Sequence, residues 1–144
     1  MKKIKITPNL GRAWIFLSLC IALHVVDEAL HDFLSVYNPM VIAIRQRAPF
    51  IPFPTFSLEL WLSGLIVGVI ILFSLASFAF REKRWTVFLS YFLGVIMIIN
   101  AFSHFAGTIY LGKAMPGVYS SPFLLAAALY LLWSARDSHK THRK

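Results

Sequence analysis

Five ionisable side chains lie within nine residues of an apolar segment near the N-terminus: His24, Asp27, Glu28, His31 and Asp32. Spacings of three, four and seven residues place the first four of them on one face of a helix. Imidazole and carboxylate groups are ligands for Zn²⁺ and related divalent ions, and they are also common general acids and bases. The segment therefore indicates either a metal site or acid–base chemistry.

A second apolar segment carries Asn100 and His104, which are four residues apart and so share a helix face. When the inner ends of the two segments are aligned, Ala13 with Trp85, Asn100 falls level with Glu28 and His104 falls one turn further out. We therefore expect the polar residues of the two segments to face one another at the same depth. Asn100 would then orient a ligand or polarise a substrate carbonyl.

A divalent metal ion, either zinc or another metal, is the cofactor that these residue types favour. We predict His24, Glu28 and His104 as its ligands, with His31 or Asp27 as a further ligand. The spacing matches no standard zinc motif, so chemistry without a metal stays open. In that case the groups that would act as general acid and base, or support them, are Glu28, Asp27, His24, Asn100 and His104.

Further polar or turn-forming residues are expected at the same outer level. One is the last residue of the ionisable cluster, one lies at the start of the apolar segment 58–80, and three precede the apolar segment 122–135. We expect these residues to line the pocket: Asp32, Glu59, Pro116, Gly117 and Ser120.

The composition of the chain shows which elements must position these residues. Of its 144 residues, 58% are hydrophobic and 14% charged, and the mean hydropathy is +0.70. These values exclude an ordinary soluble domain and a disordered chain. The chain has four apolar segments, and the first three reach the roughly 20 residues that cross a bilayer. They predict one all-α integral membrane domain over residues 1–144. This domain is a bundle of four transmembrane helices at 13–34, 58–80, 85–110 and 122–135.

The basic residues predict the orientation of that bundle. Lys and Arg total 14 against 6 acidic residues, and eleven of the fourteen lie at the N-terminus, in the turn 81–84 or in the C-terminal tail. By the positive-inside rule both termini are cytoplasmic and the pocket faces the extracytoplasmic side. The net charge of +8 is then a topology signal, and we expect no nucleic-acid partner.

The segment 36–57 is rich in proline and aromatic residues and is expected to be an extracytoplasmic loop. Residues 40–46 could form a short interfacial helix within it. The segment is either an inert connector or a lid over the pocket. Gly64 and Gly68 form a GxxxG pair, which allows a packing face or a homodimer seam.

Three short patterns resemble the signatures of the bacterial HXXEE membrane-protein family, whose function is unknown. They occur in the family's order: 24–28 for HxxEE, 100–104 for NxxxH and 116–120 for PGxxT. Asp27 stands where the first pattern has its first Glu, and Ser120 where the third has Thr, and both keep the functional group. The resemblance implies an enzyme-like constellation in a bacterial inner membrane and supplies no substrate.

We therefore expect a membrane-embedded enzyme whose partner is a lipid or small amphiphile, hydrolysed with a metal's assistance or isomerised by acid–base chemistry. Two alternatives stay open. One is a small-molecule or ion-binding protein, or a proton-coupled transporter. The other is a non-catalytic protein whose buried polar network locks the helices together. The inner halves of the predicted helices carry no ionisable groups, which weighs against transport.

Overall fold

The computed structural model describes residues 9–141, and all its regular secondary structure is helical. The five helices are α1 (Leu10–Leu30), α2 (Phe33–Arg47), α3 (Leu58–Phe80), α4 (Arg84–Leu111) and α5 (Ser121–Thr141). The predicted all-α class is thus confirmed. Most of the basic residues of the two termini, which carry the predicted orientation, lie outside the described residues.

Three of these helices, α1, α3 and α4, are long and apolar enough to cross a membrane. The chain is therefore a membrane protein by the length and composition of its helices. The fourth predicted crossing has a different character. α5 has 21 residues, or about 31 Å at 1.5 Å per residue. It extends beyond the predicted end at residue 135 through Arg136 and Asp137, so its apolar part is shorter than the helix.

The first predicted helix ends earlier than expected. α1 stops at Leu30 rather than at residue 34, and Asp32 adopts a left-handed conformation with φ of 51°. Asp is one of the few residues that accept this conformation. The chain changes direction there and immediately starts α2, which occupies much of the predicted loop and contains Pro39. The expected interfacial helix at 40–46 is thus the second half of a longer helix.

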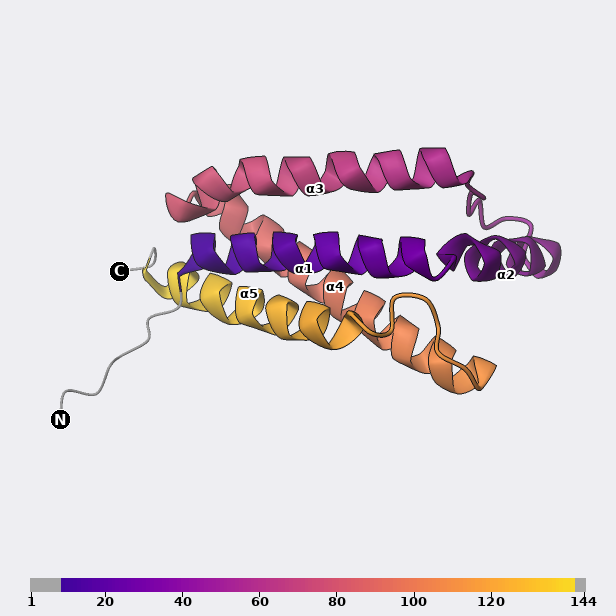
Figure 1. Ribbon diagram of the computed structural model, residues 1–144. Helices are drawn as coiled ribbons and strands as arrows, with labels where there is room; N and C mark the ends of the chain where they lie inside the picture. Colours follow the sequence, from indigo (N-terminus) through magenta and orange to yellow (C-terminus); the bar gives the residue numbers. More distant parts are fainter. Residues whose placement is uncertain (1–8, 142–144) are drawn as a thin grey trace.

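The four long helices pack side by side in a row, and the contacts between neighbouring pairs of helices are unequal. α1 packs against α3 on one side and α5 on the other, and α4 packs mainly against α5. α3 and α4 are joined by the turn at 81–83, where the rings of Phe78 and Trp85 lie 5.5 Å apart. From that turn they diverge (Figure 1), and they make few other contacts. The row therefore has the order α3, α1, α5, α4, with few contacts between its two outer helices. Side chains of α1 and α4 also meet, as Trp14 and Ser90 do.

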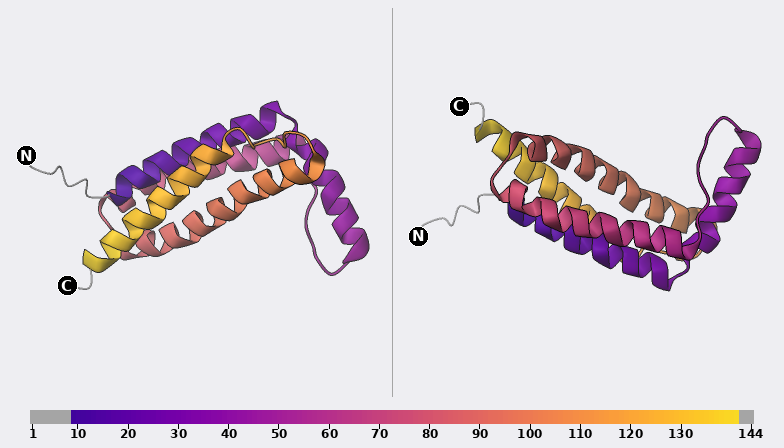
Figure 2. Two further views of the ribbon diagram at one scale, coloured as in Figure 1. Left: turned by 90° about the horizontal axis from the view of Figure 1, so that it is seen from below. Right: turned by 90° about the horizontal axis from the view of Figure 1, so that it is seen from above.

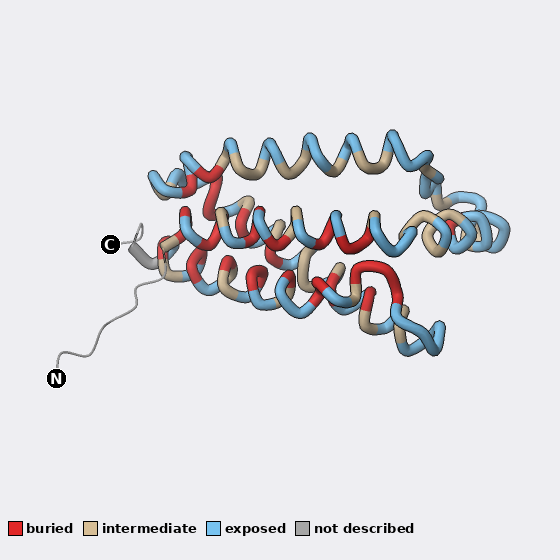
Figure 3. The backbone as a smooth tube through the Cα atoms, viewed as in Figure 1, coloured by how far each residue is buried: buried red, intermediate tan, exposed pale blue. Residues whose placement is uncertain are grey.

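The apolar core occupies one half of the row, towards the ends where the two termini lie (Figure 3). Trp14 is its largest fully buried side chain, and its indole nitrogen donates a 2.7 Å hydrogen bond to Ser90 Oγ. Alanines of α3 and α5 let the helices approach α1 closely. Because this half is packed with apolar side chains, the buried ionisable groups are concentrated in the other half, near α2.

α2 leaves the row at its other end and points away from the long helices (Figure 2). The chain after α2 returns to α3 through a segment that is tied to α2 by side chains. Asn38 exchanges two hydrogen bonds with the backbone of Phe56, at 2.9 and 3.0 Å, and Tyr37 donates to the carbonyl of Pro54 at 3.1 Å. These contacts fix the proline-rich segment against α2.

Candidate metal site

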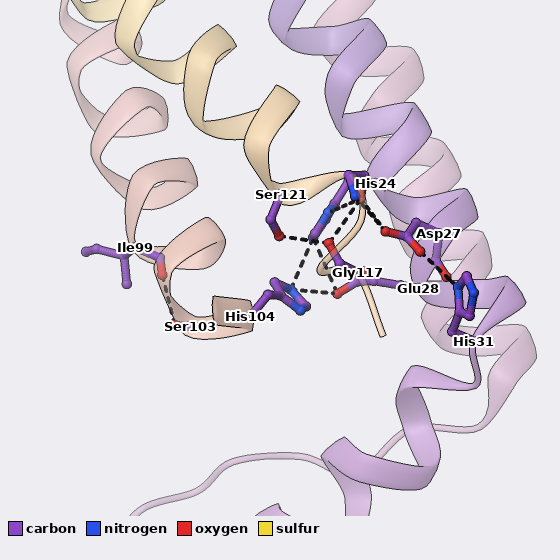
Figure 4. A network of polar contacts seen from close by, with 10 residues as sticks. His24, Asp27, Glu28, His31, Ile99, Ser103, His104, Gly117 and Ser121 are labelled. Carbon is purple, nitrogen blue, oxygen red and sulfur yellow. Dashed lines mark hydrogen bonds and ion pairs between the residues drawn. The ribbon is translucent and has the colours of Figure 1, made fainter. Parts of the chain in front are cut away.

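Three buried side chains from α1 and α4 converge on one point, and we call them the triad: His24, Glu28 and His104 (Figure 4). Their residues are at most 6% exposed. His24 Nε2 lies 3.2 Å from His104 Nε2, and Glu28 Oε1 lies 3.6 and 3.3 Å from these two atoms. The triad is the group that sequence spacing and depth predict, and it could hold a metal ion.

The spacing of the three ligand atoms matches what a tetrahedral ion requires. Ligand atoms about 2.1 Å from zinc are about 3.4 Å apart at tetrahedral angles. The three observed separations run from 3.2 to 3.6 Å. Two imidazoles and one carboxylate leave a fourth position for water or substrate, as in catalytic zinc sites. The same distances also allow hydrogen bonding between the two imidazoles.

Ser120 and Asp27 lie on the side of His24 that faces away from the triad. Ser120 Oγ is 2.8 Å from His24 Nδ1. The Oγ and backbone N–H of Ser120 both donate to Asp27 Oδ2, at 2.7 and 2.8 Å. Ser120 immediately precedes α5, so docking of α5 beside α1 joins groups that are more than 90 residues apart in the chain.

His31 lies outside the triad, on the far side of Asp27. Its Nδ1 is 2.9 Å from Asp27 Oδ1 and 2.8 Å from the carbonyl oxygen of Asp27, and its side chain is 48% exposed. The structure therefore does not bring His31 to the predicted metal position. Asp27 does not reach it either, because its two carboxylate oxygens are directed to Ser120 and His31.

Gly117 packs closely against the imidazole rings of both His24 and His104. Its φ is 88°, and a Cβ built on it would lie 2.6 Å from His104 Cε1 and 2.9 Å from His24 Cε1. Only glycine combines this backbone conformation with this close approach. The neighbouring Pro116 is buried as well. The Gly117 carbonyl accepts a hydrogen bond from the Ser121 hydroxyl and lies 3.1 Å from Ser120 Oγ. The predicted turn residues thus form one wall of the site.

Two polar atoms beside the triad have no hydrogen-bond partner among the described residues. They are Asn100 Oδ1 and His104 Nδ1, both buried, on successive turns of α4. Buried polar atoms are paired in most proteins, and the side chain of Asn100 also interacts with the imidazole of His24. The structure thus places Asn100 beside the site, as the sequence predicts.

The remaining predicted pocket residues lie away from the triad. Asp32 is exposed at the junction of α1 and α2, and Glu59 is exposed in the first turn of α3. Depth alone placed them near the site. The open seam between α3 and α4 and the turn at Asp32 separate them from it.

An aromatic side chain that the sequence does not single out completes the surroundings. The ring of Phe33 lies 6.0 Å from that of His104 and stacks on Trp61 and Tyr37 at 5.8 and 5.5 Å. The helical spacing of the first segment gives no signal for Phe33, because the break at Asp32 redirects the chain just before it. Trp61 of α3 is part of this aromatic group.

Two apolar cavities flank α2 beside the site. One, of about 380 Å³, lies between α2 and α3 and is lined by residues that include Phe33, Trp61 and Gly64. The other, of about 510 Å³, lies between α2 and α4 and is lined by residues that include Met40, Ser103 and Gly107. No triad residue lines either cavity, but Phe33, which lines the first, has its ring 6.0 Å from that of His104.

The comparison with protein families gives one match. The model of a family described as "Protein of unknown function with HXXEE motif" matches residues 14–131. The matched region extends from the start of α1 well into α5 and contains the whole triad, Asn100, Gly117 and Ser120. Neither a curated protein nor a solved structure matches the sequence.

Proposed function

Because the chain belongs to the HXXEE family, whose function is unknown, we propose its function from the geometry of the site. We propose a membrane-embedded enzyme that binds a divalent metal ion, preferably zinc, at His24, Glu28 and His104. One observation carries the proposal, namely three buried ligand atoms of two helices at the separations of tetrahedral ligands. Burying such groups seldom improves stability over apolar residues, which favours a role in function.

The substrate we propose is a lipid or another amphiphile, hydrolysed or isomerised at the polar end of the pocket. The two apolar cavities beside α2 support this, since they offer room for an alkyl chain, and Phe33 of the first cavity lies against His104. A bound divalent ion would supply Lewis-acid activation of a carbonyl or a water molecule. Asn100 Oδ1 would accept a hydrogen bond from a hydroxyl or amide of the substrate.

The proposed location is a bacterial inner membrane, with α5 as a fourth crossing, both termini cytoplasmic and the triad towards the extracytoplasmic side. Most of the described basic residues support this orientation, with Arg45, Arg47 and Lys113 as the exceptions. Arg12, the turn 81–83 and Arg136 lie at the end of the row opposite α2 (Figure 1), where the positive-inside rule requires them.

A second candidate function is acid–base catalysis by the triad without a metal. The 3.2 Å separation of the two Nε2 atoms supports it, because one imidazole can donate a hydrogen bond to the other there. A homodimer also stays a proposal. Gly64 and Gly68 have open space around them, since nothing lies within 4 Å of a Cβ built on either.

Incubation of the purified protein with a bacterial lipid extract and Zn²⁺ tests the enzyme proposal. We expect mass spectrometry to show loss of one amphiphile and gain of its product. Glu28→Gln should slow this by about 100-fold or more, the range for loss of a catalytic acid or base. Asp137→Asn, the same chemical change at the opposite end of the row, should have no effect. Equal rates for these two variants, or no conversion by the zinc-loaded protein, would exclude this activity.

The cavity between α2 and α3 can be tested by filling it. The indole of Gly64→Trp would occupy the space of an alkyl chain in this cavity. Displacing only two methylene groups of the substrate from the cavity costs about 1.6 kcal/mol of binding free energy, which lowers turnover more than tenfold. We expect this loss with unchanged zinc content. Gly68→Trp is the matched control, because Gly68 also lies in open space of α3 but does not line the cavity. Equal turnover of the two variants would show that the chain binds elsewhere.

A further inference from the structure

We infer that Ser120 and Asp27 are positioning residues that fix the tautomer of His24. In this tautomer the Nε2 lone pair faces Glu28 and His104 in the absence of any ligand. The consequence for metal binding rests on the proposed function. The tautomer itself does not, because it follows from hydrogen bonds that are independent of a metal. The inference gives a role to the two positions at which this chain differs from the HxxEE and PGxxT patterns.

The first step concerns the proton of the Ser120 hydroxyl. Asp27 Oδ2 lies 2.8 Å from the backbone nitrogen of Ser120, which can only donate, so this oxygen is an acceptor. The hydroxyl has one proton and two neighbouring oxygen acceptors, Asp27 Oδ2 at 2.7 Å and the Gly117 carbonyl at 3.1 Å. A carboxylate at the shorter distance is the stronger acceptor. The Ser120 proton is therefore directed to Asp27.

The second step concerns the proton of His24. Because the Ser120 hydroxyl donates its proton to Asp27, its Oγ can only accept a hydrogen bond from His24 Nδ1, which is 2.8 Å away. Nδ1 therefore carries the proton, and in a neutral imidazole Nε2 then has a free lone pair. Nε2 is the atom that lies 3.2 Å from His104 Nε2 and 3.6 Å from Glu28 Oε1.

The third step concerns the orientation of the His24 ring. Gly117 packs so closely that a Cβ built on it would lie 2.9 Å from His24 Cε1. A ring flipped by 180° would place Cδ2 instead of Nδ1 against Ser120 Oγ and lose the 2.8 Å hydrogen bond, so this bond favours the observed orientation. Outer partners that orient a ligating histidine in this way commonly change metal affinity by about 10- to 100-fold.

The tautomer can be read directly by ¹⁵N NMR of the metal-free full chain, labelled at histidine and held in detergent micelles. We expect His24, identified by loss of its signals in His24→Gln, to carry its proton on Nδ1. Ser120→Ala should remove this preference, and Ser120→Thr, which keeps the hydroxyl, should restore it. Ser121→Ala is the matched control, since it also removes a buried hydroxyl bonded to Gly117 but does not touch His24.

A zinc titration of the same proteins measures the consequence. Ser120→Ala should weaken zinc binding by about 10- to 100-fold, whereas Ser121→Ala and Ser120→Thr should change it less than about threefold. A wild-type proton on Nε2, or equal shifts in Ser120→Ala and Ser121→Ala, would overturn the inference. Wild-type protein with the expected tautomer and no zinc binding would instead overturn the proposed metal function and leave the role of Ser120 in place.

Discussion

Replacing His24 or His104 by alanine is expected to abolish stoichiometric metal binding. Each imidazole supplies one of the three ligand atoms of the triad, and the two that remain leave half of a tetrahedral shell to water. The loss should exceed the roughly 10- to 100-fold effect of removing an outer partner. Elemental analysis of protein purified without chelators, followed by zinc titration, measures it. Wild-type protein should hold about one ion per chain.

His31→Ala separates the structural ligand set from the one that sequence spacing allows. His31 lies on Asp27 and outside the triad, so His31→Ala should retain the metal. His139→Ala removes an exposed imidazole of α5 and controls for adventitious binding. Retention of metal in His24→Ala and His104→Ala, or equal loss in all four variants, would contradict the proposed site.

Gly117→Ala is expected to damage both the fold and the site. The left-handed backbone costs an L residue about 1–2 kcal/mol, and forcing a methyl group against the two imidazoles costs about 1–3 kcal/mol more. The expected decrease in the free energy of unfolding is therefore about 2–5 kcal/mol. Denaturant unfolding in micelles measures this decrease. Zinc titration should show weaker binding as well, because the methyl group displaces the rings of His24 and His104.

Gly112→Ala isolates the backbone part of that effect. Gly112 ends α4 with φ of 63°, and nothing lies within 4 Å of a Cβ built on it. It should lose about 1–2 kcal/mol from conformation alone and keep its zinc affinity. If the two variants lost the same free energy and bound zinc equally, the close approach of Gly117 to the imidazoles would have no energetic weight.

The helical elements and the triad could be predicted because both depend on regular geometry. Long apolar segments in this composition have no other stable form in a bilayer, and all helices rise by the same distance per residue. Aligning the inner ends of two helices therefore placed Glu28 and Asn100 at one depth. The same alignment puts His104 level with residue 32, whereas the structure places its Nε2 3.2 Å from that of His24, so the alignment did not predict this pairing.

Features that depend on a single residue or on a long-range contact could not be predicted in this way. Hydropathy carries no signal for the left-handed turn at Asp32, so the end of α1 and the full length of α2 were missed. Ser120 was predicted to line the pocket, but its bond to His24 was not, because that bond exists only where α5 docks beside α1. The open seam between α3 and α4, which leaves Glu59 outside the site, is likewise a property of packing.

The position of the Gly117–Ser120 turn has a consequence for the biogenesis of the site. α1, α3 and α4 are apolar enough to enter a bilayer as they leave the ribosome, and they carry the whole triad. The residues that orient and enclose His24 come immediately before α5, which is synthesised after α1, α3 and α4. A nascent or truncated chain that lacks α5 therefore has its ligands inserted but not ordered.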